Sequence, residues 1–461
     1  MPGRPPSRFS PLSLVARAAN GLAKTPARFV TVGFAAVILA GALVLMLPIA
    51  KQGDGGAPFL TALFYSTSAV CVTGLGTVDL PNYFTHFGQV VIMLLVQIGG
   101  FGVLTLTSVI TLIVARRFGL KTRLLAQTER GALALGDVRH ILKGVALLSI
   151  GVESVVTVLL TIRLMTSHDY GLGHALWRGL FHAISSFNNA GFALWSDNLM
   201  GFATDWWFSL TICAAVVTGG IGFPVILELA ARRRQFWSWS LHTKLTVLVT
   251  AALLFVGTVA VLGFEWSNSG TLGPLSVGHK LLAAFFGSVT PRTAGFNTVD
   301  YSQMNGETLF VTDMLMFVGG GSGGTAGGIK VTTFALLLLI VISEARGDRH
   351  VHAFHRRIPA HAHRQALVIA FLAMNAVVLA TLVLMATSDF LLYQTLFEAI
   401  SAFGTVGLST GITGSLDWLG QSILIALMFL GRTGPQTLAL ALSLRERERL
   451  YTYPEERPII G

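Results

Sequence analysis

The chain has 461 residues, of which 53% are hydrophobic and only 12% are charged, about half the charged fraction that is usual in soluble domains. This composition excludes an ordinary soluble protein and favours one that crosses a membrane several times. The net charge of +10 lies mostly in a few loops, which argues against nucleic-acid binding, and the two cysteines, Cys71 and Cys213, lie in apolar segments, which argues against a disulfide framework or a zinc site.

Eight stretches are long and apolar enough to cross a membrane as helices: 29–47, 87–115, 141–165, 205–229, 244–264, 308–343, 365–387 and 418–443. Four shorter apolar stretches lie between the members of each pair, at 59–72, 174–188, 278–290 and 390–404. Stretches of that length are too short to span and are typical of re-entrant segments. The sequence therefore predicts an all-α polytopic membrane protein of eight transmembrane helices and four re-entrant pore helices around one central pore.

The repeated order of long, short and long stretches divides the chain into four units between two tails. We assign the tails to residues 1–28 and 446–461, and the units to 29–118, 119–234, 235–346 and 347–445. Residues 1–28 have no signal-peptide cleavage pattern, so we expect them to form a cytoplasmic tail.

Basic residues predict the orientation of the chain. Of the 32 Lys and Arg residues, 25 fall in the two terminal segments and in loops 116–143, 232–244 and 346–364. By the positive-inside rule both termini are cytoplasmic and the four short segments enter from outside. The opposite loops carry Asp54, Asp79, Asp169, Asp197, Asp205, Asp300, Asp389 and Asp417. These carboxylates either concentrate cations at the outer mouth or are ordinary solvated loop residues.

Each short stretch leads into a loop with a glycine followed by a large apolar residue. The loops read Val72-Thr73-Gly74, Asn189-Ala190-Gly191, Thr293-Ala294-Gly295 and Thr405-Val406-Gly407. A phenylalanine stands ten residues before each glycine, and a serine stands six before it except in the third copy, where Val289 takes that place. One copy would be a common pattern in a glycine-rich membrane protein, but four copies predict an internal fourfold repeat.

A pore for cations would explain why the four loops repeat the same pattern. Irregular backbone at membrane depth is tolerated where it is buried in protein or lines a water-filled cavity. Four loops that converge on one axis place rings of carbonyl oxygens around a file of ions and replace their hydration shell. Glycine suits such a loop because it reaches positive φ without steric cost, and the following Leu or Phe can pack behind it.

The sixth long stretch is interrupted by Gly319, Gly320, Gly321, Ser322, Gly323, Gly324, Thr325, Ala326, Gly327 and Gly328, followed by Ile329 and Lys330. So many glycines cannot keep a stable helix, since each costs about 1 kcal/mol relative to alanine. We expect a loop just inside the filter, with Ser322, Thr325 and Lys330 facing water. A phosphate-binding loop is excluded because Lys330 is preceded by Ile329 and followed by Val331. A helix-packing face remains the alternative for the glycines alone.

Arg432 lies deep in the last apolar stretch. An arginine there normally faces a cavity or a partner and marks an ion pathway. It would either repel a resident ion or pair with a polar loop, and the alternative is a structural arginine with a carboxylate or carbonyl partner. Glu153 and Glu398 are the candidate carboxylates.

These residues together resemble the Trk/Ktr/HKT superfamily of potassium transporters, and most closely the membrane subunit of bacterial Ktr systems. The resemblance covers about residues 29–445 and rests on the four glycine loops, the Gly319–Lys330 stretch and Arg432. Cys71, Pro291 and Arg292, just before two of the loops, depart from the pattern and leave the innermost ion site open.

The resemblance implies function. It implies potassium uptake across the bacterial cytoplasmic membrane, with a selectivity filter at residues 72–74, 189–191, 293–295 and 405–407, which hold K⁺ as the only metal. Some plant members that transport sodium carry a serine in the first loop. This chain has Gly74 there, which by resemblance implies a preference for potassium. Residues 319–328 with Lys330 would be the gate, narrowed by Arg432. The resemblance also implies a homodimer on a separate cytosolic RCK-type ring, and any nucleotide would be bound by that ring. Sodium coupling and sodium stimulation are not distinguished.

Two other classes of protein stay open. A secondary transporter for another small solute also uses broken helices, but it usually shows two related halves rather than four units. An intramembrane enzyme would need a nucleophile and a base, and His182, in a short segment, has no partner at a telling spacing. The histidines at 350, 352, 355, 361 and 363 either chelate metal adventitiously or belong to a solvated or partner-contacting loop.

Overall fold

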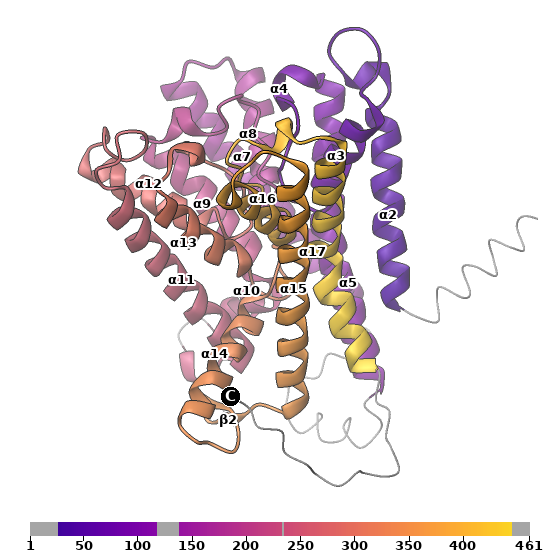
Figure 1. Ribbon diagram of the computed structural model, residues 1–461, viewed down its shortest axis with the longest axis vertical. Helices are drawn as coiled ribbons and strands as arrows, with labels where there is room; N and C mark the ends of the chain where they lie inside the picture. The colour runs from indigo at the N-terminus through magenta and orange to yellow at the C-terminus, as the bar shows by residue number, and fades with distance from the viewer. Residues whose placement is uncertain (1–25, 118–137, 233–234, 445–461) are drawn as a thin grey trace, which may run out of the picture.

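The computed structural model describes residues 26–117, 138–232 and 235–444 (Figure 1). Most of the predicted tail 1–28, the predicted tail 446–461 and the loop 118–137 lie outside the described residues. The described chain is predominantly helical. Its α-helices are α2 (Pro26–Leu45), α3 (Phe59–Val70), α4 (Leu80–Tyr83), α5 (His86–Arg117), α7 (Val138–Ser167), α8 (Leu172–Phe187), α9 (Trp206–Ile221), α10 (Phe223–Ala231), α11 (Leu241–Glu265), α12 (Val277–Val289), α13 (Gly306–Phe317), α14 (Val331–Ala345), α15 (Ala360–Thr387), α16 (Leu392–Gly404) and α17 (Trp418–Leu444).

Short connections add five 3-10 turns and one hairpin. The turns are η1 (Pro48–Ala50), η2 (Met200–Phe202), η3 (Phe236–Ser238), η4 (Tyr301–Gln303) and η5 (Thr413–Ser415). Strands β1 (His352–Ala353) and β2 (Arg356–Arg357) pair antiparallel, with His352 opposite Arg357. The predicted histidine-rich loop is thus a small hairpin. Its Val351, Ala353 and Ile358 pack against partly buried side chains of α11 and α14.

The apolar stretches found in the sequence coincide with helices. The four short stretches form α3, α8, α12 and α16, with ends within two residues of the predicted ones. Two long stretches are broken: α13 ends at Phe317 and α14 begins at Val331, and α9 and α10 meet at Gly222 with a bend of 99°. Gly222 has a φ of 101°, a conformation that only glycine adopts without steric cost, so this glycine allows the bend.

Length and hydropathy identify a subset of these helices as membrane spans by themselves. Within the described residues, Lys143–Ser167, Leu241–Glu265 and Ala360–Thr387 meet both criteria, and the bent pair α9–α10 makes a fourth span if it is counted as one. Shorter apolar helices include Thr31–Leu45, His86–Gly102 and Val331–Ala345. The structure is therefore that of a polytopic helical protein, and the number of eight spans stays a prediction.

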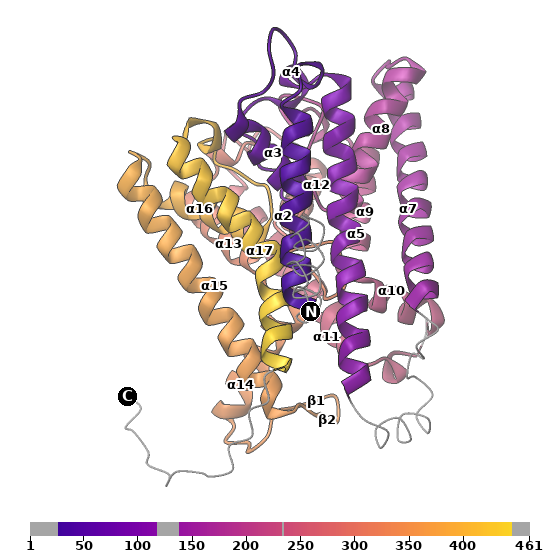
Figure 2. The same cartoon turned by 90° about the vertical axis from the view of Figure 1, so that its right-hand side faces the viewer.

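Each short helix packs between longer ones. Helix α3 contacts α2 and α5, α8 contacts α7 and α9, α12 contacts α11 and α9, and α16 contacts α13, α15 and α17. The short helices lie in the upper half of both views, whereas the β-hairpin and α14 lie at the lower end (Figures 1 and 2). The largest buried cluster includes Phe64, Phe84, Phe181 and Phe397, so the core surrounds the short helices and their loops.

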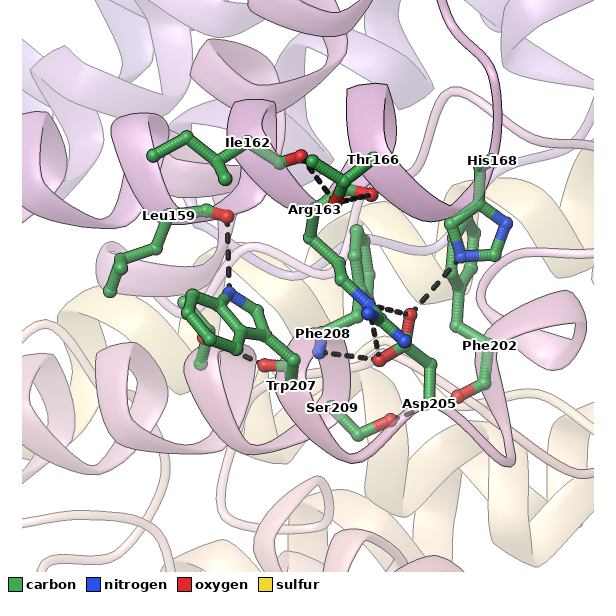
Figure 3. A network of polar contacts seen from close by, with 11 residues as sticks. Leu159, Ile162, Arg163, Thr166, His168, Phe202, Asp205, Trp207, Phe208 and Ser209 are labelled. Atoms are coloured by element: carbon green, nitrogen blue, oxygen red, sulfur yellow. Dashed lines mark hydrogen bonds and ion pairs between the residues drawn. The ribbon is translucent and has the colours of Figure 1, made fainter.

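An ion-pair cluster joins α7 to α9 (Figure 3). Nε of Arg163 donates to both carboxylate oxygens of Asp205 at 2.9 and 3.0 Å, and His168 lies 3.1 Å from the same carboxylate. Asp205 also caps α9 by accepting from the Phe208 N–H at 3.1 Å. Burial raises the pKa of the Asp205 carboxyl, but the hydrogen bonds from Arg163, Phe208 and His168 outweigh burial, and the pKa lies below its ordinary value.

Candidate functional site

The four predicted glycine loops share one backbone conformation. In each loop the residue two before the glycine is left-handed: φ is 58° at Val72, 60° at Asn189, 69° at Thr293 and 51° at Thr405. The glycines also have positive φ, with 93° at Gly74, 69° at Gly191, 73° at Gly295 and 96° at Gly407. A left-handed β-branched residue is strained, so its recurrence at equivalent positions points to a functional constraint. Residues 72–74, 189–191, 293–295 and 405–407 are called the ring loops below.

The ring loops encircle one axis. A Cβ atom built on Gly74 would lie 3.0 Å from the Cα of Gly191, one on Gly191 2.9 Å from Gly295, one on Gly295 3.1 Å from Gly407, and one on Gly407 3.2 Å from Gly74. Each built Cβ would also press on the carbonyl oxygen of the residue before the next glycine. The four glycines therefore form a closed cycle in chain order, with backbone carbonyls in the contact between neighbouring loops.

Hydroxyl groups of the short helices hold three ring loops through the serine found in the sequence. Ser68 accepts from the Gly74 N–H at 3.1 Å and donates to the Leu75 carbonyl at 2.8 Å. Ser185 donates to the Phe192 carbonyl at 2.9 Å, and Ser401 accepts from the Gly407 N–H at 3.1 Å.

The third ring loop lacks that serine and is held one residue later. Thr290, next to Val289, donates to the Phe296 carbonyl at 2.5 Å. The sequence comparison missed Thr290 because it is offset by one position from the aligned serines. The large apolar residues after the glycines, Leu75, Phe192, Phe296 and Leu408, are all buried, as the sequence predicted.

A second position in the short helices binds the segment that follows each of three ring loops, although the residue type at this position differs from one copy to the next. Nine residues before the glycine stand Tyr65, His182 and Glu398 in units one, two and four. The Tyr65 hydroxyl donates to the Val78 carbonyl, His182 accepts from the Leu194 N–H at 3.2 Å, and Glu398 accepts from the Thr410 N–H at 3.2 Å. The same task is thus done by a phenol, an imidazole and a carboxylate.

An open cavity of about 330 Å³ lies over the ring, and its lining includes Gly74, Gly191 and Gly407. Its lining also includes Asp79 and Asp197, two of the aspartates that the sequence placed in the outer loops. Two carboxylates at the mouth of a cavity attract cations.

The glycine-rich segment forms a loop over residues 318–330, as predicted. The Gly319 N–H donates to the Ile329 carbonyl at 2.8 Å and closes the base of the loop. The loop also binds the break between α9 and α10: the Gly321 N–H donates to the Gly220 carbonyl at 2.8 Å, and the Phe223 N–H donates to the Gly323 carbonyl at 3.1 Å. The glycines here serve close backbone contact within a loop, not a continuous helix-packing face.

The glycine-rich loop reaches the ends of the short helices where the ring loops begin. The Thr325 hydroxyl donates to the Phe187 carbonyl at 3.2 Å, and a Cβ on Gly328 would lie 3.3 Å from the Gly404 backbone. Thr325 is fully buried, so the expectation that it faces water is wrong: its hydroxyl is used to bind the loop to α8. Ser322 is half-buried beside Thr332 at 3.1 Å, and the half-buried Lys330 donates to the Ala326 carbonyl at 2.5 Å.

Arg432 is almost fully buried and pairs with this loop. One terminal nitrogen donates to the Thr325 carbonyl and the other donates to the Gly99 carbonyl at 3.1 Å. Of the alternatives left open by the sequence, the structure shows Arg432 paired with carbonyls, one of them in the polar loop, and neither candidate carboxylate is its partner. Glu153 instead accepts from Gln97 at 3.0 Å and from Asn188 at 3.2 Å, because it lies behind the second ring loop, and Glu398 binds the segment after the fourth.

The described residues hold no group of three or more His, Cys, Asp or Glu side chains that could bind a metal ion. The site offers backbone carbonyls instead, in a ring at its centre and in the loop beside it. Carbonyl oxygens bind alkali cations by replacing their hydration shell. The role of the twelve ring-loop residues in selecting an ion stays a prediction.

Comparison with known proteins agrees with this geometry. Residues 14–452 match the family model described as TrkH, cation transport protein. The chain is 41% identical over 437 residues to the Ktr system potassium uptake protein B of Bacillus subtilis, covering 95% of this chain and 97% of that one. It is 34% identical to the potassium/sodium uptake protein NtpJ of Enterococcus hirae, covering 95% and 97%. The crystal structure of the potassium transporter TrkH from Vibrio parahaemolyticus shares the fold, with a TM-score of 0.67 at 17% identity over 89% of this chain and 82% of that one.

Proposed function

Because this chain belongs to the TrkH family of cation transport proteins, which are membrane transporters and not enzymes, we propose that it carries potassium ions across the bacterial cytoplasmic membrane. The relatives that support potassium as the ion are a Ktr system potassium uptake protein at 41% identity and a potassium/sodium uptake protein at 34% identity. No further group is needed on this chain, since the transported ion is its only ligand.

The observation that carries the proposal is the closed cycle of Gly74, Gly191, Gly295 and Gly407. A cation at the centre of this cycle is coordinated by backbone carbonyls from four sides, and the strained left-handed residues set the direction of those carbonyls. In this proposal the ring loops are the selectivity filter, and the cavity with Asp79 and Asp197 is its outer vestibule.

The proposed pore is built from four units, each a helix, a short pore helix and a second helix, within the boundaries predicted from the sequence. The contacts of α3, α8, α12 and α16 with the longer helices support this division. The basic hairpin then faces the cytoplasm together with both termini.

The glycine-rich loop 319–328 is proposed as the gate. It lies where the ring loops begin, and its backbone is held by Arg432 and by the break at Gly222. Moving this loop requires breaking hydrogen bonds but no rearrangement of a packed helix, because the loop has few side chains.

Regulation is proposed to come from outside the chain. Two relatives are named protein B of a Ktr system, a name that implies a further subunit. We propose a homodimer that docks on a separate cytosolic nucleotide-binding ring, and the exposed Arg356 and Arg357 of the hairpin offer a basic surface for it.

Complementation of potassium-uptake-deficient cells tests the proposal, with the chain expressed alone and with a candidate ring subunit. We expect growth at low potassium, and proteoliposomes that hold the purified chain should take up Rb⁺ faster than Na⁺. Equal Rb⁺ and Na⁺ uptake, or no uptake with any ring subunit, would contradict the proposal.

A further inference from the structure

Arg292 is a buried arginine at the start of the third ring loop, where the sequence departs from the family pattern. Its side chain is 94% buried, since only 6% of the residue is exposed. The Arg292 N–H donates to the Val289 carbonyl at 3.1 Å, and the next residue, Thr293, has the left-handed conformation of the ring loops. The backbone of Arg292 is therefore held against the end of α12, directly before the third ring loop.

The far end of the same side chain binds the glycine-rich loop. Nη2 of Arg292 donates to the Gly319 carbonyl at 3.0 Å. Within the described part of the chain, no carboxylate lies within ion-pair distance of this guanidinium, and Nη1 has no hydrogen-bond partner. Arg292 is thus a single side chain that connects the third ring loop to the first residue of the proposed gate.

A buried charge without a counter-ion makes that connection strong. Removing a guanidinium from water is costly, and carbonyl dipoles are what offsets the cost here. If Gly319 moves away, the guanidinium loses its only described acceptor. The charge therefore favours the position of the glycine-rich loop that is seen in this structure.

A small cavity adjoins Arg292 and the start of the glycine-rich loop. It has a volume of about 20 Å³, enough for about one water molecule, and it is lined by Arg292, Gly320 and Thr250, together with apolar side chains of α9 and α11. The Thr250 hydroxyl also has no partner among the described residues. Thr250 therefore shares the surroundings of Arg292 and offers a control position for it.

We propose that Arg292 is a latch: it holds the glycine-rich loop in the closed position through the Gly319 carbonyl and couples that loop to the third ring loop. This inference rests on the proposed function of the ring and the glycine-rich loop. Arg292 is a positioning residue in this role, because its described hydrogen bond is to the loop and not to the transported ion. It differs from Arg432 in place, since Arg432 holds the middle of the loop at Thr325.

Rb⁺ uptake into proteoliposomes without a ring subunit tests the latch. Arg292→Gln removes the charge, and we expect uptake about tenfold above that of the native chain, which corresponds to about 1.4 kcal/mol. Arg292→Lys keeps the charge and a donor, and its uptake should rise by no more than about threefold. Thr250→Val is the matched control, because Thr250 lines the same cavity and its hydroxyl has no partner among the described residues, and the uptake of this variant should stay unchanged.

A second measurement reports loop position without relying on flux. Ser322→Cys places a thiol on the glycine-rich loop, and the native Cys71 and Cys213 are both buried. A charged thiol reagent added from the cytoplasmic side should modify this cysteine several-fold faster when Arg292→Gln is also present, and no faster with Thr250→Val. If Arg292→Gln does not fold, the same comparison is made with Arg292→Lys, which should show a smaller increase.

The outcomes separate the latch from the function on which it rests. Equal Rb⁺ and Na⁺ uptake by the native chain would overturn the proposed function. Rb⁺-selective uptake by the native chain, with native uptake and native modification rates in both Arg292 variants, would overturn the latch alone. An equal rise with Thr250→Val would also overturn it, because the effect would then come from loosening the cavity.

Discussion

The ring predicts that two glycines four residues apart respond very differently to the same substitution. Gly407 and Gly411 both have positive φ, 96° and 92°, so alanine costs about 1–2 kcal/mol of backbone strain at either position. A Cβ on Gly411 would have no atom within 4 Å. A Cβ on Gly407 would overlap the Thr73 carbonyl oxygen and lie 3.2 Å from the Cα of Gly74. The difference between the two variants therefore isolates the contact between neighbouring ring loops.

The size of the effect follows from what the Thr73 carbonyl does. Alanine at position 407 forces this carbonyl out of its place, because the overlap is with backbone that cannot turn away as a side chain can. A polar partner of a charged group is worth about 1.5–3 kcal/mol, so losing one carbonyl lowers the affinity of an ion site by about 10- to 100-fold. An ion site whose carbonyl oxygens no longer keep a fixed spacing also loses its preference for K⁺ over Na⁺.

Paired Rb⁺ and Na⁺ uptake into proteoliposomes is the assay, with thermal unfolding in detergent as the measure of folding. Gly411→Ala should lose only about 1–2 kcal/mol of stability to backbone strain, and Gly407→Ala should lose more, because its Cβ also displaces the Thr73 carbonyl. Gly411→Ala should keep the native ratio of Rb⁺ to Na⁺ uptake, and Gly407→Ala should lower that ratio at least tenfold. A native ratio in a folded Gly407→Ala protein would refute the assignment of the ring as the filter.

Three further substitutions test the rest of the site. Arg432→Ala removes two hydrogen bonds to backbone carbonyls, and Rb⁺ uptake without a ring subunit should rise about tenfold; native uptake would argue against a gate held by this arginine. Glu398→Ala leaves the hydrogen-bond donors after the fourth ring loop unpaired. It should lower the free energy of unfolding by about 2–4 kcal/mol, measured by denaturant titration. Glu344→Ala, on the exposed end of α14, is the control and should leave the free energy of unfolding almost unchanged. Asp205 lies just outside the span that begins at Trp206, and the pKa of its carboxyl is lowered in the folded protein. The ionised carboxylate therefore stabilises the folded protein fully above the ordinary pKa of about 3.9, and this contribution is lost as the pH falls through the lower pKa of the folded state. The Tm gap between the native chain and Asp205→Asn should therefore close in acid, and a gap that does not change with pH would contradict the ion-pair role.

Repetition made much of this site predictable. In the proposed filter the backbone has positive φ at the glycine, and the next residue is bulky and buried. Few residue types suit either position, so Gly74, Gly191, Gly295 and Gly407 stand in register with a large apolar residue after each. The same reasoning found the glycine-rich loop, because so many glycines cannot stay helical. Arg432 was found by its charge in an apolar helix, and its carbonyl partners were among the alternatives considered.

Features that depend on a partner far along the chain were not predictable in this way. Tyr65, His182 and Glu398 stand at equivalent positions, and each binds the segment that follows its ring loop. Their side chains have only the ability to form hydrogen bonds in common. Glu153 was offered as a partner for Arg432, but the fold places it beside Asn188. A single sequence shows which charges are buried but does not show which of several polar groups each one meets.

The contacts of the glycine-rich loop suggest how one loop from one predicted unit would serve the proposed pore of four. The loop belongs to the third unit, and its backbone binds the second unit at Gly220. It lies against the backbone of the fourth unit at Gly404, and Arg432 joins it to the first unit by binding Thr325 and Gly99 together. A loop that contacts the second and fourth predicted units directly, and is joined to the first through Arg432, would lie near the axis that the ring loops encircle. Side chains on such a loop would collide with the surrounding backbone, so a position near the axis favours glycine. The break between α13 and α14 is then a consequence of where the loop lies.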